Sequence, residues 1–149
     1  MSIFDVQTPQ ESLGFQFWKL HSQWQKRVSE TLVPFNITHT QFVMLASIAW
    51  FEEQKISPSQ AQVAKLMNLE KMTFSKAVRQ LERNKLVRRS KSKRDARLKC
   101  LSLQTQALDI IPQVMQAIEN IDKEIFAALG DHKQTFNKIL LILNKNLGA

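Results

Sequence analysis

Glycine and proline are scarce in this 149-residue sequence, which holds three of the first and four of the second. Their scarcity favours long helices over a β protein with many turns. The single cysteine, Cys100, cannot cross-link the fold by itself, and no group of cysteine and histidine has the spacing of a metal site. No apolar run approaches the roughly 18 residues of a transmembrane helix, and the first residues lack the pattern of an export signal. We therefore expect a cytoplasmic protein that uses no membrane, metal or cofactor.

Residues that carry enzyme chemistry are few and dispersed. The three glycines lie far apart, which excludes a glycine-rich phosphate-binding loop. The three histidines, His21, His39 and His132, have no carboxylate or cysteine at ligand spacing. A Ser/His/Asp triad assembled from distant segments stays open, although nothing in the sequence indicates one. We predict a protein without enzymatic activity.

Positive charge is concentrated in one segment of the chain. Residues 65–99 hold 13 Lys and Arg side chains against three acidic ones, a net charge of +10. The remainder holds eight bases and ten acids, so the overall excess of +8 comes from this segment. A basic segment within a folded domain is typical of proteins that bind a polyanion, most often nucleic acid. The alternative is a solvated face that only serves solubility, although such faces usually mix both signs.

The first part of the chain has the periodicity of helices. In residues 11–32 apolar side chains recur at helical spacing, and Pro34 ends the pattern. Thr38 and Gln41 then form a capping box, with Ile37 and Phe42 placed as its hydrophobic staple. The helix that follows is nearly all apolar, so we expect it at the centre of the core.

A second capping pattern opens the stretch SPSQAQVAKLMNL. We predict Ser57 as the cap, Pro58 as the first helical residue and Gln60 as the partner that completes the box. Asn68 falls where a left-handed turn should end this short helix, a conformation that asparagine tolerates.

The next helix, in EKMTFSKAVRQLERNKLV, has two distinct faces. Its apolar side chains fall within one arc of about 100°, as a core-facing stripe requires. The opposite side is polar and basic. Two helices joined by a tight turn, the second with a polar outer face, form a helix-turn-helix arrangement.

The rest of the chain predicts a hairpin and further helices. VRRS and RLKCLSL have the length of strands and flank the basic segment KSKRDA. Residues 105–147 return to helical spacing in two apolar stripes separated at Gly130, and Pro112 should kink the first or confine its start. Together with residues 11–32 they offer more apolar surface than one DNA-reading module needs. We expect them to pack against a second copy of the chain; the alternative is a bundle within one chain.

In order and length these segments resemble the MarR family of winged helix-turn-helix regulators over nearly the whole chain. The pieces that carry the resemblance are Thr38 to Gln41, LERNKLV, and Asp95 and Arg97 followed by Leu101 and Leu103. The resemblance implies a mainly α fold in a single unit, 1–149. Residues 35–103 would form the winged helix-turn-helix lobe with a two-stranded β wing, and residues 1–34 and 104–149 the dimerisation helices. The sequence departs from the family at Lys85, where glycine is usual, and at Gln104 and Ala107, where threonine and glycine are usual.

The resemblance and the outward face together give a set of predicted DNA-binding residues. The recognition helix would use Thr73, Ser75, Lys76, Arg79 and Gln80. Ser59 and Gln60, at the preceding helix start, would contact phosphate. In the wing, Lys91, Lys93 and Arg94 would neutralise phosphates, and Arg97 would enter the minor groove. We expect Asp95 to hold the Arg97 guanidinium in one orientation; the alternative is that Asp95 only forms the turn, and both can hold.

Effector binding rests on the aromatic residues. The family resemblance implies a cleft for a small aromatic ligand between the dimerisation helices and the DNA-binding lobe. Its candidate lining is Phe17, Trp18, His21, Trp24 and Trp50. Aromatic side chains at helical spacing also fit a core or a dimer interface. Cys100 lies among bases that would favour its thiolate, but its strand position favours a packed thiol over a redox sensor.

The sequence thus predicts a dimeric regulator, a repressor on a near-palindromic operator in double-stranded DNA, released by a small aromatic ligand. Two other functions stay open. The winged helix could be a protein-interaction module that docks an acidic partner, or a coat that binds nucleic acid without sequence preference. The Thr, Ser and Gln side chains among the bases favour the reading of DNA sequence, because base edges are recognised by neutral hydrogen-bonding groups as well as by charge.

Overall fold

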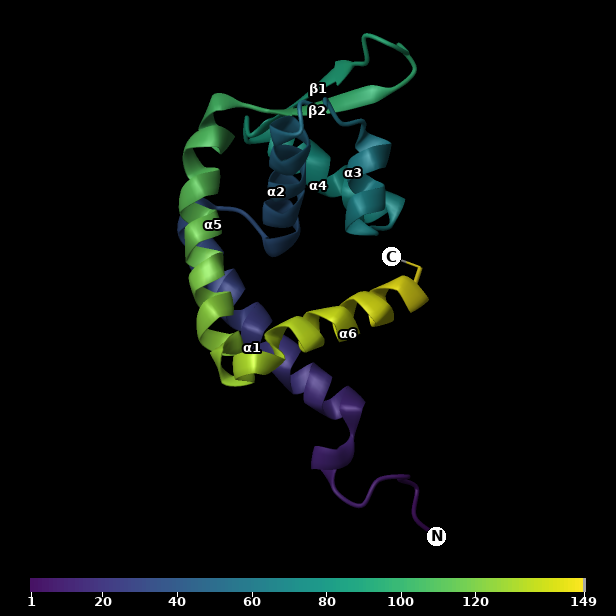
Figure 1. Ribbon diagram of the computed structural model, residues 1–149. Helices are drawn as coiled ribbons and strands as arrows, with labels where there is room; N and C mark the ends of the chain where they lie inside the picture. Colours follow the sequence, from purple (N-terminus) through teal and green to yellow (C-terminus); the bar gives the residue numbers. More distant parts are fainter. Residues whose placement is uncertain (149) are drawn as a thin grey trace.

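A computed structural model describes residues 1–148, which form a lobe carried on a helical stem (Figure 1). The lobe consists of α2 (His39–Glu53), α3 (Gln60–Met67), α4 (Lys71–Arg83) and the hairpin of β1 (Val87–Lys91) and β2 (Lys99–Leu103). The stem is built from α1 (Leu13–Leu32) and α5 (Thr105–Phe126), and α6 (Lys133–Asn146) leaves its far end. Short 3-10 segments lie before and after α1 and between α5 and α6, at Pro9–Glu11, Val33–Phe35 and Ala127–His132. This is the predicted mainly α winged helix-turn-helix architecture.

Two capping boxes start the first two helices of the lobe. At α2 the Gln41 backbone N–H donates to Thr38 Oγ1 at 3.2 Å, and the Thr38 N–H donates to Gln41 Oε1 at 2.9 Å, as predicted. At α3 the prediction is wrong by two residues, because the cap is Ser59 and its partner is Gln62. Ser57 is exposed, and Pro58 is not helical.

Tertiary contacts explain this shift of the α3 start. The Pro58 carbonyl accepts a hydrogen bond from the Leu101 N–H at 2.8 Å, and Ser59 pairs with Cys100 as an isolated bridge. Both contacts require extended backbone at Pro58 and Ser59, so the helix begins at Gln60, two residues later than predicted. The base of the wing is therefore joined directly to the start of α3.

Three non-glycine residues adopt the left-handed conformation at helix ends in the lobe, and the first of them, Lys55, follows α2 with φ 61°. Asn68 ends α3 with φ 49°, as predicted, and Lys85 follows α4 with φ 58°. Lys85 thus takes the left-handed turn that glycine would adopt without steric cost.

The core of the lobe surrounds α2. Its Met44, Leu45 and Ile48 side chains are completely buried, together with Leu81 of α4 and Leu101 of β2. The buried face of α4 is the predicted stripe: Phe74, Ala77, Val78 and Leu81. Because this stripe is held in the core, the opposite face of α4 points to solvent.

The wing is an antiparallel pair in which Val87 lies opposite Leu103 and Lys91 opposite Lys99. Two hydrogen bonds fasten its base. The Leu103 N–H donates to Glu52 Oε1 of α2 at 2.9 Å, and Gln104 Nε2 donates to the Val87 carbonyl at 2.9 Å. Gln104 immediately precedes α5, so one side chain joins the wing to the long helix of the stem.

The stem packs α1 against α5. Trp24 Nε1 donates to Asp122 Oδ1 at 2.8 Å, and Arg27 pairs with Glu124 nearby. The α5 helix begins at Thr105 and runs through Pro112, so the proline does not confine its start. Leu108, although apolar, is exposed on this helix. The buried residues are Ala107, Ile111, Val114, Ile118 and Ile121.

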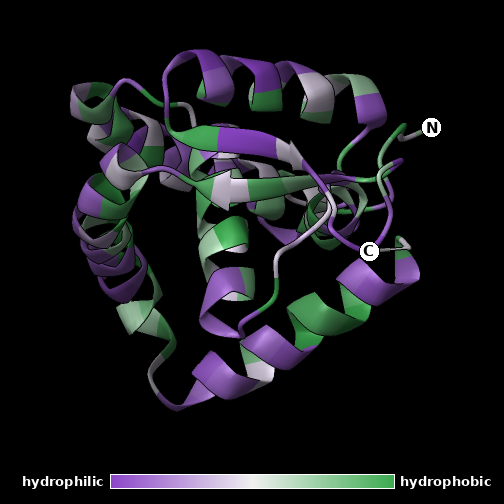
Figure 2. Cartoon of the chain, turned by 90° about the horizontal axis from the view of Figure 1, so that it is seen from above, coloured by the Kyte–Doolittle hydropathy of each residue, from purple (hydrophilic) through white to green (hydrophobic). Residues whose placement is uncertain are grey.

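The C-terminal helix α6 projects from the stem (Figure 1), and hydrophobic and hydrophilic positions alternate along it (Figure 2). None of its described residues is buried, and Ile139, Ile142 and Leu143 are exposed. A bundle closed within one chain would have covered them.

Among residues 1–148 no single helix is long and apolar enough to cross a membrane. The pair Leu13–Phe35 and His39–Glu53 meets that test only jointly, with a bend of 76° between them.

Candidate nucleic-acid interface

The outward face of α4 carries the predicted recognition residues. Thr73, Lys76, Arg79 and Gln80 are exposed, and Ser75 is half-buried at the edge of the face. Spacings of three and four residues place Thr73, Lys76 and Gln80 on one surface. This surface offers hydroxyl, ammonium, guanidinium and amide groups, which can read base edges as well as contact phosphate.

Ser59 and Gln60 lie at the start of α3, where both are half-buried. The Ser59 hydroxyl accepts the Gln62 N–H at 3.1 Å, and its own N–H donates to Gln62 at 2.8 Å. Gln60 turns its Oε1 atom inward, where that atom is buried and has no partner among the described residues. The Ser59 hydroxyl hydrogen and the Gln60 amide nitrogen therefore remain available to donate hydrogen bonds to a phosphate of DNA.

The wing tip is organised around Asp95. Its carboxylate accepts three hydrogen bonds from Arg97, from the backbone N–H at 3.0 Å, Nε at 3.2 Å and Nη2 at 3.3 Å. The Arg97 side chain and then its backbone N–H hold the pKa of Asp95 below its ordinary value. The Asp95 carbonyl also accepts the Leu98 N–H at 3.0 Å, which closes the turn. Asp95 is therefore placed to do two things: it closes the turn, and it holds the Arg97 side chain.

The other bases of the wing surround this pair. Lys91, Lys93 and Arg94 are exposed, and Arg97 keeps 90% of its side-chain surface exposed. Cys100 lies at the buried end of β2, where the free thiol is packed.

A groove between α4 and β1 combines Arg79 of the predicted recognition face with three residues that were not predicted as part of a site. It encloses about 500 Å³ and is lined by Arg79, Glu82, Arg83 and Arg89. Arg89 Nε donates to Glu82 Oε2 at 2.6 Å, and both side chains are partly exposed. The sequence did contain a signal for Arg89. Side chains two residues apart on a strand lie on the same face, so Arg89 faces α4 together with the buried Val87.

The aromatic residues proposed for a ligand cleft do not form one group. Phe17, His21 and Trp24 follow one another along α1 with ring centroids 6.1 Å apart, and Trp24 meets His39 edge-on at 5.0 Å. Trp18 instead stacks on Phe15, at the exposed end of α1.

Trp50 lies elsewhere, edge-on to Phe51 in α2. The aromatic side chains that follow one another along α1 end at His39, where α1 meets the lobe. The His39 Nδ1 atom lies 2.8 Å from Gln25 Oε1. Burial, and next the nearby His21, lower the pKa of His39, against an opposing effect of Asp122.

Solved structures with the same fold come from bacterial regulators. The MepR–DNA complex of S. aureus covers 95% of this chain and 98% of its own, with a TM-score of 0.79 and 20% identity. A mutant of MarR from E. coli complexed with operator DNA covers 94% and 99%, with the same TM-score and identity. CouR from Rhodococcus jostii RHA1 bound to p-coumaroyl-CoA covers 93% of both chains, again at 0.79 and 20%.

Sequence comparison identifies the family. The model of the ArnR1-like winged-helix domain matches residues 33–122. The HTH-type transcriptional regulator YdcH of Bacillus subtilis (strain 168), itself uncharacterised, is 32% identical over 120 residues, which make up 80% of this chain and 82% of that protein. This chain belongs to the ArnR1-like winged-helix family of HTH-type transcriptional regulators. These relatives are regulators, in keeping with the expectation of a protein without enzymatic activity.

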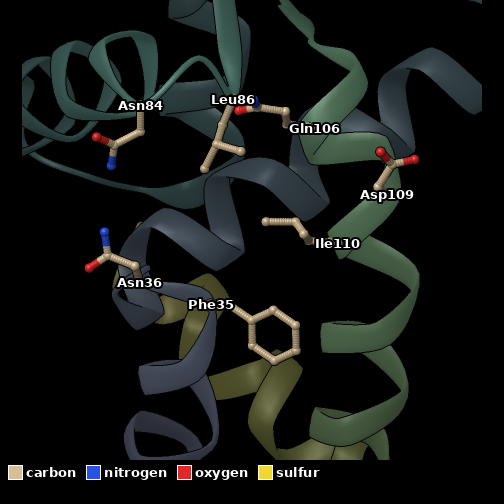
Figure 3. Close-up of a pocket in the computed structure, with 7 residues that line it drawn as sticks. All are labelled: Phe35, Asn36, Asn84, Leu86, Gln106, Asp109 and Ile110. Carbon is tan, nitrogen blue, oxygen red and sulfur yellow. The ribbon is translucent and has the colours of Figure 1, made fainter.

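In this winged-helix regulator, a cavity of about 370 Å³ lies where the lobe meets the stem (Figure 3). The segment after α1, the turn after α4 and the first turns of α5 provide its lining. The lining residues are Phe35, Asn36, Asn84, Leu86, Gln106, Asp109 and Ile110. None of them belongs to the predicted aromatic set, so the aromatic series and this cavity are separate features.

Proposed function

We propose that this MarR-type regulator binds double-stranded DNA as a homodimer and represses transcription from a near-palindromic operator. The observation that carries the proposal is that the outer face of α4 and the wing both expose basic side chains. The α4 face also contains neutral hydrogen-bonding groups next to its charges, as the recognition of base sequence requires. The MepR and MarR complexes with DNA support the same use of the fold.

Each recognition helix enters a major groove, and each wing reaches the adjacent minor groove. Asp95 orients the Arg97 guanidinium, and the narrow groove attracts it through its negative potential. Lys91, Lys93 and Arg94 neutralise the neighbouring phosphates, and Ser59 and Gln60 contact the backbone from the start of α3.

Dimerisation uses α6 and the first half of α1. The apolar side chains left uncovered on α6 and on the first half of α1 supply an interface for the same surfaces of a second copy. A twofold axis between the copies places the two recognition helices about one helical turn of DNA apart, so the operator has near-palindromic half-sites.

Release by a small aromatic ligand belongs to the same proposal. CouR was crystallised with p-coumaroyl-CoA, and BpsR of Bordetella bronchiseptica is regulated by 6-hydroxynicotinic acid. Here the series Phe17, His21 and Trp24 leads from the stem to His39 at the start of the lobe. An aromatic ligand inserted beside Trp24 would act where the two parts meet.

The test selects preferred duplexes from a random pool with purified protein and compares the selected duplex with shuffled DNA over a salt titration. An enriched near-palindrome, bound about 10³-fold or more tightly than shuffled DNA, is the expected result. Arg97→Ala should weaken operator binding more than Lys91→Ala, since only Arg97 enters the groove. Equal binding of both duplexes at every salt concentration would overturn the proposal and leave a sequence-neutral coat or a protein-docking module.

A further inference from the structure

The groove between α4 and β1 sits beside the recognition surface and has its own charge. Arg79, Arg83 and Arg89 contribute three positive charges and Glu82 one negative, which leaves a net charge of +2 among its lining residues. Arg79 also belongs to the outward face of α4, so the groove continues the predicted recognition surface toward the C-terminal end of the helix.

Glu82 determines how Arg89 is presented. The carboxylate accepts a hydrogen bond from Nε only, and within residues 1–148 no hydrogen bond occupies the two terminal amino groups of Arg89. A guanidinium held at Nε keeps two donors in a fixed plane, the arrangement that binds two oxygens of one phosphate. The Arg89 side chain is 29% exposed to solvent, so a ligand from outside can reach these donors.

The length of α4 indicates where these donors lie on DNA. Its 13 residues span about 20 Å, whereas the major groove is about 12 Å wide. When Thr73, Lys76 and Gln80 face the base edges, the last turn of the helix extends toward the wall of the groove. That wall is a sugar–phosphate backbone.

We propose that the groove of Arg79, Glu82, Arg83 and Arg89 binds one backbone phosphate of the operator in each half-site. In this site Glu82 is a positioning residue, because it acts only through Arg89. The inference rests on the proposed DNA-binding function and adds to it a contact that joins the recognition helix to the wing strand.

Glu82→Gln is the decisive variant, because two explanations of the role of Glu82 predict opposite changes in its affinity for DNA. If Glu82 only repels DNA, its neutralisation should tighten binding. If Glu82 positions Arg89, the same change should weaken operator binding several-fold and make the salt dependence shallower by about one counterion for each subunit. Glu70→Gln is the matched control, since it removes a negative charge from the exposed start of the same helix, where no phosphate site is proposed.

The experiment measures operator and shuffled-duplex affinity for full-length wild type, Glu82→Gln, Glu70→Gln and Arg83→Gln over a salt titration, with thermal unfolding of each protein. We expect weaker, less salt-dependent binding for Glu82→Gln and Arg83→Gln, and equal or tighter binding for Glu70→Gln. Arg83 is exposed, so its variant keeps the test valid if Glu82→Gln does not fold. Tighter binding by Glu82→Gln, or wild-type affinity and salt dependence in Arg83→Gln, would overturn the phosphate site alone. A wild type that does not prefer the operator would overturn the proposed function as well.

Discussion

Among single residues, Asp95 has a definite partner in the otherwise basic wing. Its hydrogen bonds with Arg97 favour the ionised carboxyl and hold its pKa below the ordinary value of 3.8. Their contribution is therefore complete above that value and is lost as the pH falls through the lowered pKa. We predict that Arg97→Ala raises the pKa of Asp95 toward 3.8 in a carboxyl carbon NMR titration. Arg94→Ala removes the same charge from the same tip, and equal shifts in both variants would contradict a specific pair.

His39 is the second residue with a shifted pKa. Because its pKa in the folded protein is lowered from 6.5, the unfolded chain binds a proton more readily as the pH falls below that value. The folded state therefore loses stability toward acid between 6.5 and the lowered pKa. We predict that the melting temperature falls from about pH 7.5 to about pH 5.5, and falls less in His39→Gln. His132→Gln, at an exposed site, should keep the wild-type dependence; an unchanged slope in His39→Gln would refute the assignment.

On the level of secondary-structure elements, the start of α3 gives a direct comparison between two serines. Ser59 caps the helix, whereas Ser57 is exposed and lies outside it. We predict that Ser59→Ala lowers the free energy of unfolding by about 1 kcal/mol, since a lost N-cap typically costs that much. Ser57→Ala should stay within about 0.5 kcal/mol of wild type. Urea unfolding followed by circular dichroism at one fixed protein concentration measures both, and a larger loss in Ser57→Ala would contradict the observed cap.

For the whole molecule, the uncovered face of α6 is the main test of assembly. Leu143 is 53% exposed, yet it belongs to an apolar stripe of the helix. A charge placed there would be buried and unpaired in a dimer, so we predict that Leu143→Glu yields monomers with weakened operator binding. Light scattering after size-exclusion chromatography measures the mass. Lys138→Glu, on the same helix, should leave the dimer intact, and a dimer of Leu143→Glu would exclude this face from the interface.

Local sequence rules predicted those parts of the fold that depend on neighbouring residues. Thr38 and Gln41 identified the start of α2, because both halves of that capping box are close in sequence. At α3 the segment SPSQAQ contains two overlapping frames with serine and glutamine three residues apart. The hydrogen bond from Leu101 to Pro58 and the bridge between Ser59 and Cys100, formed by residues far apart in sequence, select the second frame.

The candidate site likewise divides into features set by neighbouring residues and features set by contacts between distant segments. The face of α4 was predictable, since helical periodicity alone separates its buried and exposed residues. Arg89 was not selected, because its importance depends on how β1 lies against Glu82 of α4. The division of the aromatic set within one chain was unpredictable for a similar reason, since spacing along the chain does not show that Trp50 packs against Phe51 while Trp24 packs against His39.

The continuity of α5 has a mechanical consequence for the molecule. Its 22 residues form a rod about 33 Å long, fastened to the wing through Gln104 at one end and to α1 through Asp122 near the other. A tilt of about 6° at the stem displaces the opposite end by about 3.4 Å, the rise of one base pair. The rod is a lever, so a rotation too small to disturb the core displaces the wing by about the rise of one base pair.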